Sequence, residues 1–475
     1  MSDTTTALLR TRRFLPLFVT QTCGALNDNL VKNAIAILAL MRMAEAGPAF
    51  VAMLGGVFIA PYVLFSGLAG EIADSHDKAR MIRWTKALEV ALMTGAAIGF
   101  ATGSFAVLVV VLFGLGVQAT LFSPLKYGLL PQHLREEELV AGNGLIEAGT
   151  FSGILVGTIA GGALIGLETG PLIVAGLGVA LAGLGFVLAL RIPAAPPAAP
   201  GLRIDWNIWR SSRALITMAR PNRPVWLSIL GLSWFWTLGA TVLSALPVIA
   251  QTSLRGDNSV ATLLLTIFAV GVGVGSVLCA KLLKGEVSAR YVPFAAIAIS
   301  IGCADLAFTC FSIEGGAPLA SWTAVLGAPI GWRLLLDLLL LAVGGGLYSV
   351  PLYAIIQERS GEGATSRMIA ANNVVNALAM VAAAVLTSAL IAAGVSFEVI
   401  LLATGSEVEI AAEIQRRLEE QGVGADLVSM PSTDCFDQQD AAYREDILPD
   451  VSNKQILRVS IEAGTTIGWE RYTGL

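Results

Sequence analysis

The chain has 475 residues, of which 55% are hydrophobic and only 14% are charged, whereas a soluble protein carries about a quarter charged residues. Its net charge is −5, and it has two histidines and five cysteines without CxxC spacing. This composition argues against a zinc site and a disulfide framework. We expect no metal, no cofactor and no nucleic-acid partner.

Eleven apolar windows follow one another along the first 394 residues. Each is long enough to cross about 30 Å of hydrocarbon. In lipid such windows must be helices, because an open sheet edge would leave backbone groups unpaired. The fold class is therefore an all-α polytopic membrane protein with six spans, a long loop and five more spans. The expected spans are 14–40, 48–70, 84–103, 105–125, 139–165, 171–192, 225–250, 259–283, 291–313, 332–356 and 367–394.

Basic residues gather in alternate connections between these spans. The N-terminus, the loop with Lys78 and Lys86, and the central loop belong to a set that holds 20 Lys and Arg, against 3 in the opposite set. Loops rich in Lys and Arg face the cytoplasm. We therefore expect a cytoplasmic N-terminus and a cytoplasmic central loop, in which residues 205–219 could form an amphipathic surface helix.

The first span contains the polar sequence GALNDNLVKNA, with Asn27, Asp28, Asn29 and Lys32. Asp28 and Lys32 are four residues apart and can meet on one helix face. Ionisable residues inside a span are costly and usually mark a transport pathway. We predict that these four side chains line a substrate pathway; the alternative is an internally neutralised pair that serves packing alone.

The second span runs into the polar sequence GEIADSHDKAR, with Gly70, Asp74, Asp77, Lys78 and Arg80. Acidic groups at a helix end, with basic groups just beyond, can form a charge network that holds two helices in one of two arrangements. We predict a gating loop here; the alternative is a solvated, positively charged loop.

An internal repeat relates the two halves of the chain. SPLKYG, which contains Pro124, stands 19 residues before Asn143, and VPLYA, which contains Pro351, stands 21 residues before Asn372. Two parallel six-helix halves are a known transporter construction. By this register a twelfth span should follow residue 394, but the sequence there is not apolar enough.

The repeat also places polar side chains at matching points of the fifth and eleventh spans. Asn143 and Glu147 are one turn apart in the fifth, and Asn372 and Asn376 lie in the eleventh. We assign these four to the substrate pathway, where they could bind a polar headgroup. Equally, they could tie helices together.

The composition changes abruptly near residue 397. Residues 397–475 hold 15 acidic and 6 basic residues, and VILLATGSE and ADLVSMP are typical of strands that flank an amphipathic helix. This pattern indicates a partial α/β soluble tail. The expected domains are an N-terminal half at 1–192, a central loop at 193–224, a five-helix half at 225–396 and the tail at 397–475.

The first 396 residues resemble the major facilitator superfamily through GEIADSHDKAR, although Asp77 stands where that family usually has glycine. A closer resemblance is to the bacterial lysophospholipid transporter family, including the transporter portion of its fusions to an acyltransferase and an acyl-carrier-protein ligase. It rests on FLPLFVTQTCGALNDNLVKNA, SPLKYGLLPQHL and ELVAGNGLIEAGTFSGILVGTIAGG. The resemblance implies alternating-access transport of lysophosphatidylethanolamine and related lipids across the bacterial inner membrane, with membrane lipids and a cytoplasmic acyltransferase as partners. A major facilitator transporter of another small solute is the alternative.

The tail is similar to the C-terminal domain of transketolase. VILLATGSEVEIAAE, VSMPSTDCFDQQDAAYREDILP and IEAGTTIGWERYTG carry this likeness. The thiamine-diphosphate domains have no counterpart in the chain, so we expect a transporter and not an enzyme.

Overall fold

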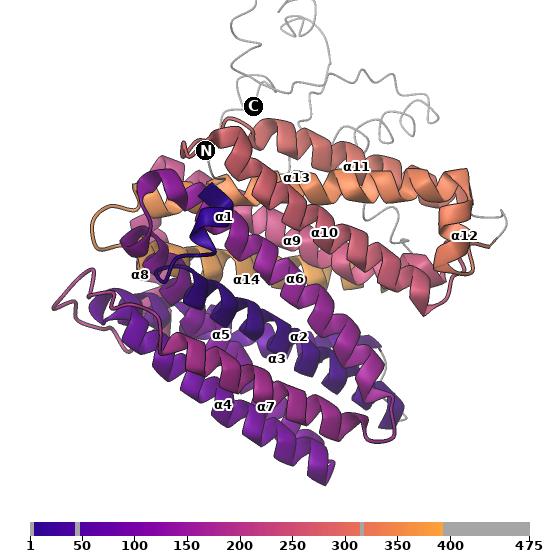
Figure 1. The fold of residues 1–475 in the computed structure, drawn as a ribbon, viewed down its shortest axis with the longest axis horizontal. Coiled ribbons are helices and arrows are strands. Elements are labelled where there is room, and N and C mark those ends of the chain that lie inside the picture. The colour runs from indigo at the N-terminus through magenta and orange to yellow at the C-terminus, as the bar shows by residue number, and fades with distance from the viewer. Residues whose placement is uncertain (1–3, 43–47, 314–317, 393–475) are drawn as a thin grey trace, which may run out of the picture.

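The computed structural model describes residues 4–42, 48–313 and 318–392, which form helices and no strand (Figure 1). Within these ranges, eleven helices have 20 residues or more, and each predicted window falls on one of them. The long helices are α2 (Leu15–Arg42), α3 (Pro48–Ser75), α4 (Lys78–Thr102), α5 (Phe105–His133), α6 (Leu139–Ile165), α7 (Gly170–Ala189), α9 (Arg223–Gln251), α10 (Asn258–Leu283), α11 (Val292–Ile313), α13 (Pro329–Arg359) and α14 (Thr365–Ala392). The predicted all-α polytopic fold is confirmed.

Nine of the long helices in the described ranges are apolar enough to cross a membrane on composition alone. The two that fall short are α2 and α4. Both carry ionisable side chains within their length, Asp28 and Lys32 in α2 and Lys86 and Glu89 in α4. These two helices bring ionisable side chains into the interior of the N-terminal half.

Short helices connect the long ones. They are α1 (Thr4–Leu8), the 3₁₀ turn η1 (Glu136–Glu138), α8 (Ile208–Ala219) and α12 (Trp322–Gly327). The predicted twelfth-span position and the α/β tail lie outside the described residues.

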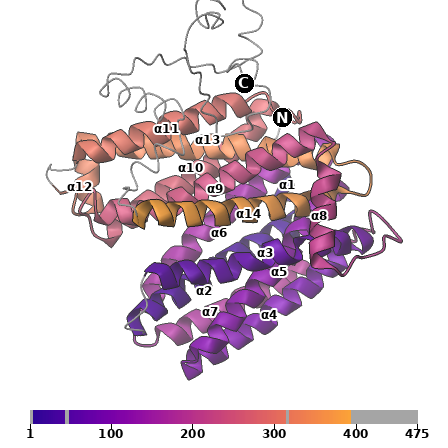
Figure 2. The ribbon, with the colours of Figure 1, turned by 180° about the vertical axis from the view of Figure 1, so that it is seen from behind.

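The helices form two bundles that diverge from a common end (Figures 1 and 2). In the first bundle α2 packs on α6 and α7, and α4 packs on α5 and α7. In the second, α10 and α11 pack on α13, and α14 packs on α9. The bundles meet where α6 contacts α10 and where α3 contacts α14.

The hydrophobic core is shared at one end of the molecule and separate at the other. One buried cluster joins residues of both bundles, from Phe14 and Leu130 to Ile356 and Ile369. A second lies in α9–α13 and takes only Phe151 from the first bundle, and a third lies wholly within α2–α7. We call the shared end the loop end, because the connections 75–78, 133–139, 189–223 and 359–365 gather there.

One boundary prediction was wrong. Lys78, Arg80, Arg83 and Lys86 were counted as a loop between the second and third spans, but α4 already begins at Lys78. Asp77 caps this helix, because its side chain accepts a hydrogen bond of 2.7 Å from the Arg80 backbone N–H. An N-terminal cap satisfies backbone donors that are otherwise unpaired, so helix formation can begin within a charged sequence.

Candidate functional site

At the loop end, Asp74 joins the two bundles. Its carboxylate is fully buried at the end of α3 and accepts hydrogen bonds from the backbone N–H groups of Ser366 and Arg367, at 3.2 and 3.1 Å. The Arg367 side chain also bonds it at 3.2 Å, and buried Lys78 lies 3.8 Å away. A helix N-terminus favours a negative charge, so Asp74 stabilises the start of α14 against α3.

Gly70 allows this contact. A side chain at Gly70 would bring its Cβ within 2.6 Å of the Ala370 Cβ and 3.0 Å of the Arg367 Cα. Only glycine lets α3 and α14 approach this closely. The structure thus brings Gly70, Asp74 and Lys78 together at the seam between the bundles.

Asp77 and Arg80 serve the neighbouring connection instead. Besides capping α4, Asp77 accepts a hydrogen bond of 3.0 Å from the backbone N–H of Ala195 in the central loop. Arg80 contributes its backbone N–H to the cap, and its side chain is exposed. Asp77 therefore holds the central loop against the start of α4.

A second link between the bundles lies deeper. Asn143 on α6 donates to the Gln357 side chain of α13 at 2.6 Å, and Gln357 donates back at 3.1 Å. Gln357 also donates to the Tyr127 carbonyl at 3.2 Å. Gln357 was not predicted as a site residue, although it lies one turn after Tyr353 in the repeated sequence. In the observed conformation, Asn143 therefore links α6 to α13.

The tyrosines of the repeat meet face to face. Tyr127 and Tyr353 stack with ring centroids 4.4 Å apart and planes at 6°. The Tyr127 hydroxyl donates to Glu147 at 2.8 Å, and the Trp236 indole N–H donates to the Tyr353 hydroxyl at 2.9 Å. The repeat-related segments therefore lie side by side at the seam, between the Asp74 contact and the separated ends.

Beside this stack lie buried polar atoms without a hydrogen bond. The second carboxylate oxygen of Glu147 has no partner, and neither the amide nitrogen nor the amide oxygen of Asn372 has one. Both side chains lie close to Tyr353. Asn376, one turn further along α14, accepts a hydrogen bond of 2.7 Å from Ser233. Unpaired polar groups in an apolar interior are costly, and a polar ligand would relieve that cost.

The polar side chains of α2 differ in their neighbours and hydrogen-bond partners. Asn27 is fully buried and donates to Glu89 at 3.3 Å, whereas Asn29 bonds its own helix, at the Ala25 carbonyl. Asp28 and Lys32 do not form the ion pair that their spacing suggested. One oxygen of Asp28 is buried without a hydrogen bond, and the Lys32 ammonium lies 5.3 Å from the centre of the Phe58 ring.

A buried ion pair on α4 was not predicted from the sequence. Lys86 and Glu89 on α4 are each only 1% exposed, and their charged atoms lie 2.6 Å apart. Gln118 of α5 donates to Glu89 at 3.1 Å, and Lys86 lies over the Phe122 ring. Lys86 had been assigned to a loop. The charges of Lys32, Lys86, Glu89 and Lys126 all act on Asp28, so α2, α4 and α5 surround it with ionisable groups.

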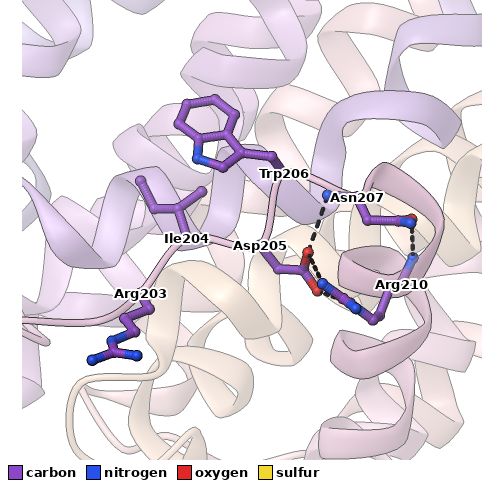
Figure 3. Close-up of a pocket in the computed structure, with 6 residues that line it drawn as sticks. All are labelled: Arg203, Ile204, Asp205, Trp206, Asn207 and Arg210. Carbon is purple, nitrogen blue, oxygen red and sulfur yellow. Dashed lines mark hydrogen bonds and ion pairs between the residues drawn. The ribbon is translucent and has the colours of Figure 1, made fainter.

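A hollow of about 470 Å³ lies elsewhere, at the start of α8 (Figure 3). It is lined by Arg203, Ile204, Asp205, Trp206, Asn207 and Arg210. It belongs to the central loop and not to the seam between the bundles.

Comparisons with known proteins agree with this architecture. The lysophospholipid transporter LplT of Enterobacter sp. (strain 638) is 33% identical over 349 residues, covering 71% of this chain and 78% of that protein. LplT of Escherichia fergusonii is 32% identical, covering 72% and 79%. The human organic anion transporter MFSD10 superposes with a TM-score of 0.63 at 14% identity, covering 83% of this chain and 94% of its own. For the proton:xylose symporter XylE the TM-score is 0.60 at 15% identity, covering 87% and 96%.

Two family models match consecutive parts of the sequence. The model described as the transketolase-like TK C-terminal domain matches residues 385–475, twelve residues earlier than the predicted start of the tail at 397. The Major Facilitator Superfamily model matches residues 17–384. With that match over most of its length, the chain belongs to the major facilitator superfamily.

Proposed function

We propose that the chain moves lysophospholipids of the lysophosphatidylethanolamine class across the bacterial inner membrane by alternating access. The observation that carries the proposal is the set of buried polar atoms without a partner, on Asp28, Glu147 and Asn372, among apolar helices. The substrate class follows from relatives named lysophospholipid transporters that are 33% and 32% identical to this chain over 349 and 348 residues.

A lysophosphatidylethanolamine headgroup combines an ammonium with a phosphate. The Asp28 and Glu147 carboxylates suit the ammonium, and Lys32 suits the phosphate, as does Lys126, whose ammonium lies over the Tyr127 ring. Charge-assisted hydrogen bonds of this kind are stronger than neutral ones. The single acyl chain would lie along the apolar faces of the same helices.

The remaining pathway residues would exchange partners during transport. Asn143 and Asn376 are bonded to Gln357 and Ser233 in the observed conformation. Once the bundles move apart at the loop end, the Asn143–Gln357 pair has to open. In this proposal Asn27, Asn29 and Asn372 complete the polar lining.

In this proposal the loop end is the cytoplasmic gate. Gly70, Asp74 and Lys78 hold α3 against α14 and keep the gate closed, while Asp77 and Arg80 fix the start of α4 beside it. The basic residues concentrated at this end support a cytoplasmic N-terminus. Opening requires that Asp74 release Arg367 and the start of α14.

The chain would act as a transporter and not as an enzyme. A lysolipid delivered to the inner leaflet is a substrate for re-acylation, so a cytoplasmic acyltransferase is the proposed functional partner. We propose no thiamine-dependent activity for residues 385–475, because that match concerns only the C-terminal domain of transketolase.

Proteoliposomes with labelled lysophosphatidylethanolamine in one leaflet test the proposal. We expect the reconstituted chain to move the label to the other leaflet, and to move diacyl phosphatidylethanolamine much more slowly. Empty liposomes are the control. Lipid movement no faster than in empty liposomes, together with uptake of a water-soluble solute, would refute the lysolipid assignment and favour the alternative.

A further inference from the structure

The short helix α8 lies across the loop end and contacts both bundles. Figure 2 shows it running across the ends of α3 and α14, and it packs on both. Ser211 donates to the buried Glu71 carboxylate of α3 at 2.9 Å, and Met218 contacts the Arg367 side chain of α14. Helix α8 therefore connects the ends of α3 and α14 at the loop end.

Helix α8 packs near the loop-end terminus of α3, the part of a membrane-spanning helix that we expect at the level of the lipid headgroups. It packs against Gly67, where an added Cβ would come within 2.7 Å of the Ser211 hydroxyl. Gly67 lies eight residues before the end of α3, roughly 12 Å along the helix. In addition, α9 begins at Arg223, only four residues after α8 ends. Both ends of α8 are thus tied to membrane-spanning helices.

The outer face of α8 and of the preceding turn combines tryptophan with arginine. Trp206 and Trp209 are 72% and 64% exposed. Arg203 and Arg213 are exposed, and within the described part of the chain no ion pair involves them. Tryptophan prefers the membrane–water interface, and basic side chains attract anionic headgroups.

The hollow of about 470 Å³ at the start of α8 is lined in part by Arg203, Trp206 and Arg210 (Figure 3). Its one acidic group, Asp205, is bonded to Arg210 at 2.7 Å and to the Asn207 N–H at 3.1 Å. The Arg210 side chain keeps the pKa of Asp205 below its ordinary value. The acid is thus neutralised locally, and the surface as a whole remains basic.

We propose that this surface, formed by Arg203, Trp206, Trp209 and Arg213, binds the headgroups of anionic phospholipids in the adjacent leaflet. The site is separate from the transport pathway and does not depend on which substrate is carried. By fixing α8 on α3 and α14, bound anionic lipid would favour the conformation in which the loop end is closed.

Amide hydrogen exchange of the full chain in nanodiscs tests this proposal. We expect phosphatidylglycerol mixed into phosphatidylcholine to slow exchange in α8 and at the start of α14, relative to phosphatidylcholine alone. Each arginine should contribute roughly fivefold to anionic-lipid affinity. The double variant Arg203→Gln, Arg213→Gln should therefore lose most of the phosphatidylglycerol effect. High salt should weaken the effect in the wild type.

The variant Arg10→Gln, Arg12→Gln is the matched control, because it removes two exposed arginines near the same end without touching α8. It should retain the phosphatidylglycerol effect. Exchange in α8 that does not depend on lipid composition, or an effect equally strong in the Arg203, Arg213 variant, would overturn the proposal and point to a protein partner for this face. Retention of phosphatidylglycerol over phosphatidylcholine in native mass spectrometry provides a second readout.

Discussion

The buried carboxylate at the loop end and the buried polar side chains in the interior of the helix bundles differ in how fully they are hydrogen-bonded. At the loop end, Asp74 is fully buried and bonded to Ser366 and Arg367 of the other bundle. In the interior, Asp28, Glu147 and Asn372 keep buried polar atoms without a partner. The hydrogen bonds of Asp74 stabilise the observed packing of α3 on α14, although the neighbouring Lys78 ammonium and Ser366 hydroxyl are also buried without a hydrogen bond. The unpaired atoms of the interior favour a polar ligand. In the proposed function, the first arrangement belongs to a gate and the second to a pathway.

The interior also contains one satisfied pair, and breaking it should have the largest effect. Glu89→Ala leaves the Lys86 ammonium buried and unpaired, which costs about 3–5 kcal/mol. We expect a large fall in the thermal unfolding temperature of the purified chain. The matched double variant Lys86→Met, Glu89→Leu removes both charges and should recover most of the stability. If the Glu89→Ala variant were as stable as the wild type, the buried ion pair between Lys86 and Glu89 would be contradicted.

At the gate, Asp74→Asn should shift the conformational equilibrium. Hydrogen bonds to a charged group contribute about 1.5–3 kcal/mol, so the ratio of closed to open molecules should fall by roughly tenfold or more. Spin labels on the loop-end termini of α3 and α14 would report longer distances. Asp77→Asn is the control, because Asp77 binds the Arg80 and Ala195 amides and not α14. If the distances between the spin labels increased equally in both variants, Asp74 would have no specific role in holding α14 against α3.

The Asn143–Gln357 pair should contribute less. A double-mutant cycle with Asn143→Ala and Gln357→Ala should give a coupling energy of about 1 kcal/mol for stability in the closed conformation. Denaturation in the presence and absence of a closed-state binder would measure it. A coupling energy of zero would mean that the two amides do not act together.

The smallest effect is expected for Tyr127→Phe. This change keeps the stacking on Tyr353 and removes the hydroxyl that donates to Glu147, a loss of about 1 kcal/mol. The unfolding temperature should fall by a few degrees, whereas Tyr127→Ala, which also loses the stacking, should lower it further. Equal effects of the two substitutions would contradict the stacked geometry.

The sequence predicted the long helices well, because a hydrocarbon environment imposes both their length and their apolar composition. It also located the charged sequence at the end of α3 and the repeat. It failed where a charged side chain had two possible surroundings. Lys86 was assigned to a loop because lysine is typical of cytoplasmic connections, yet it is buried beside Glu89.

Side-chain pairing was harder to predict than helix position. The i,i+4 spacing favoured an ion pair between Asp28 and Lys32, but the Lys32 ammonium lies near the Phe58 ring of the neighbouring helix instead. Gln357 was missed because the repeat has no polar residue at the corresponding point, Leu130. Contacts between helices depend on packing, which hydropathy and spacing do not encode.

The account depends on charged groups of α2 that bind the lipid headgroup as it crosses. The most direct test is the rate of labelled lysophosphatidylethanolamine flipping by proteoliposomes that carry Asp28→Leu and Lys32→Leu together. This variant removes a negative and a positive charge at once, so the net charge is unchanged. We predict a rate lower by roughly tenfold or more with folding intact; flipping at the wild-type rate would contradict the account.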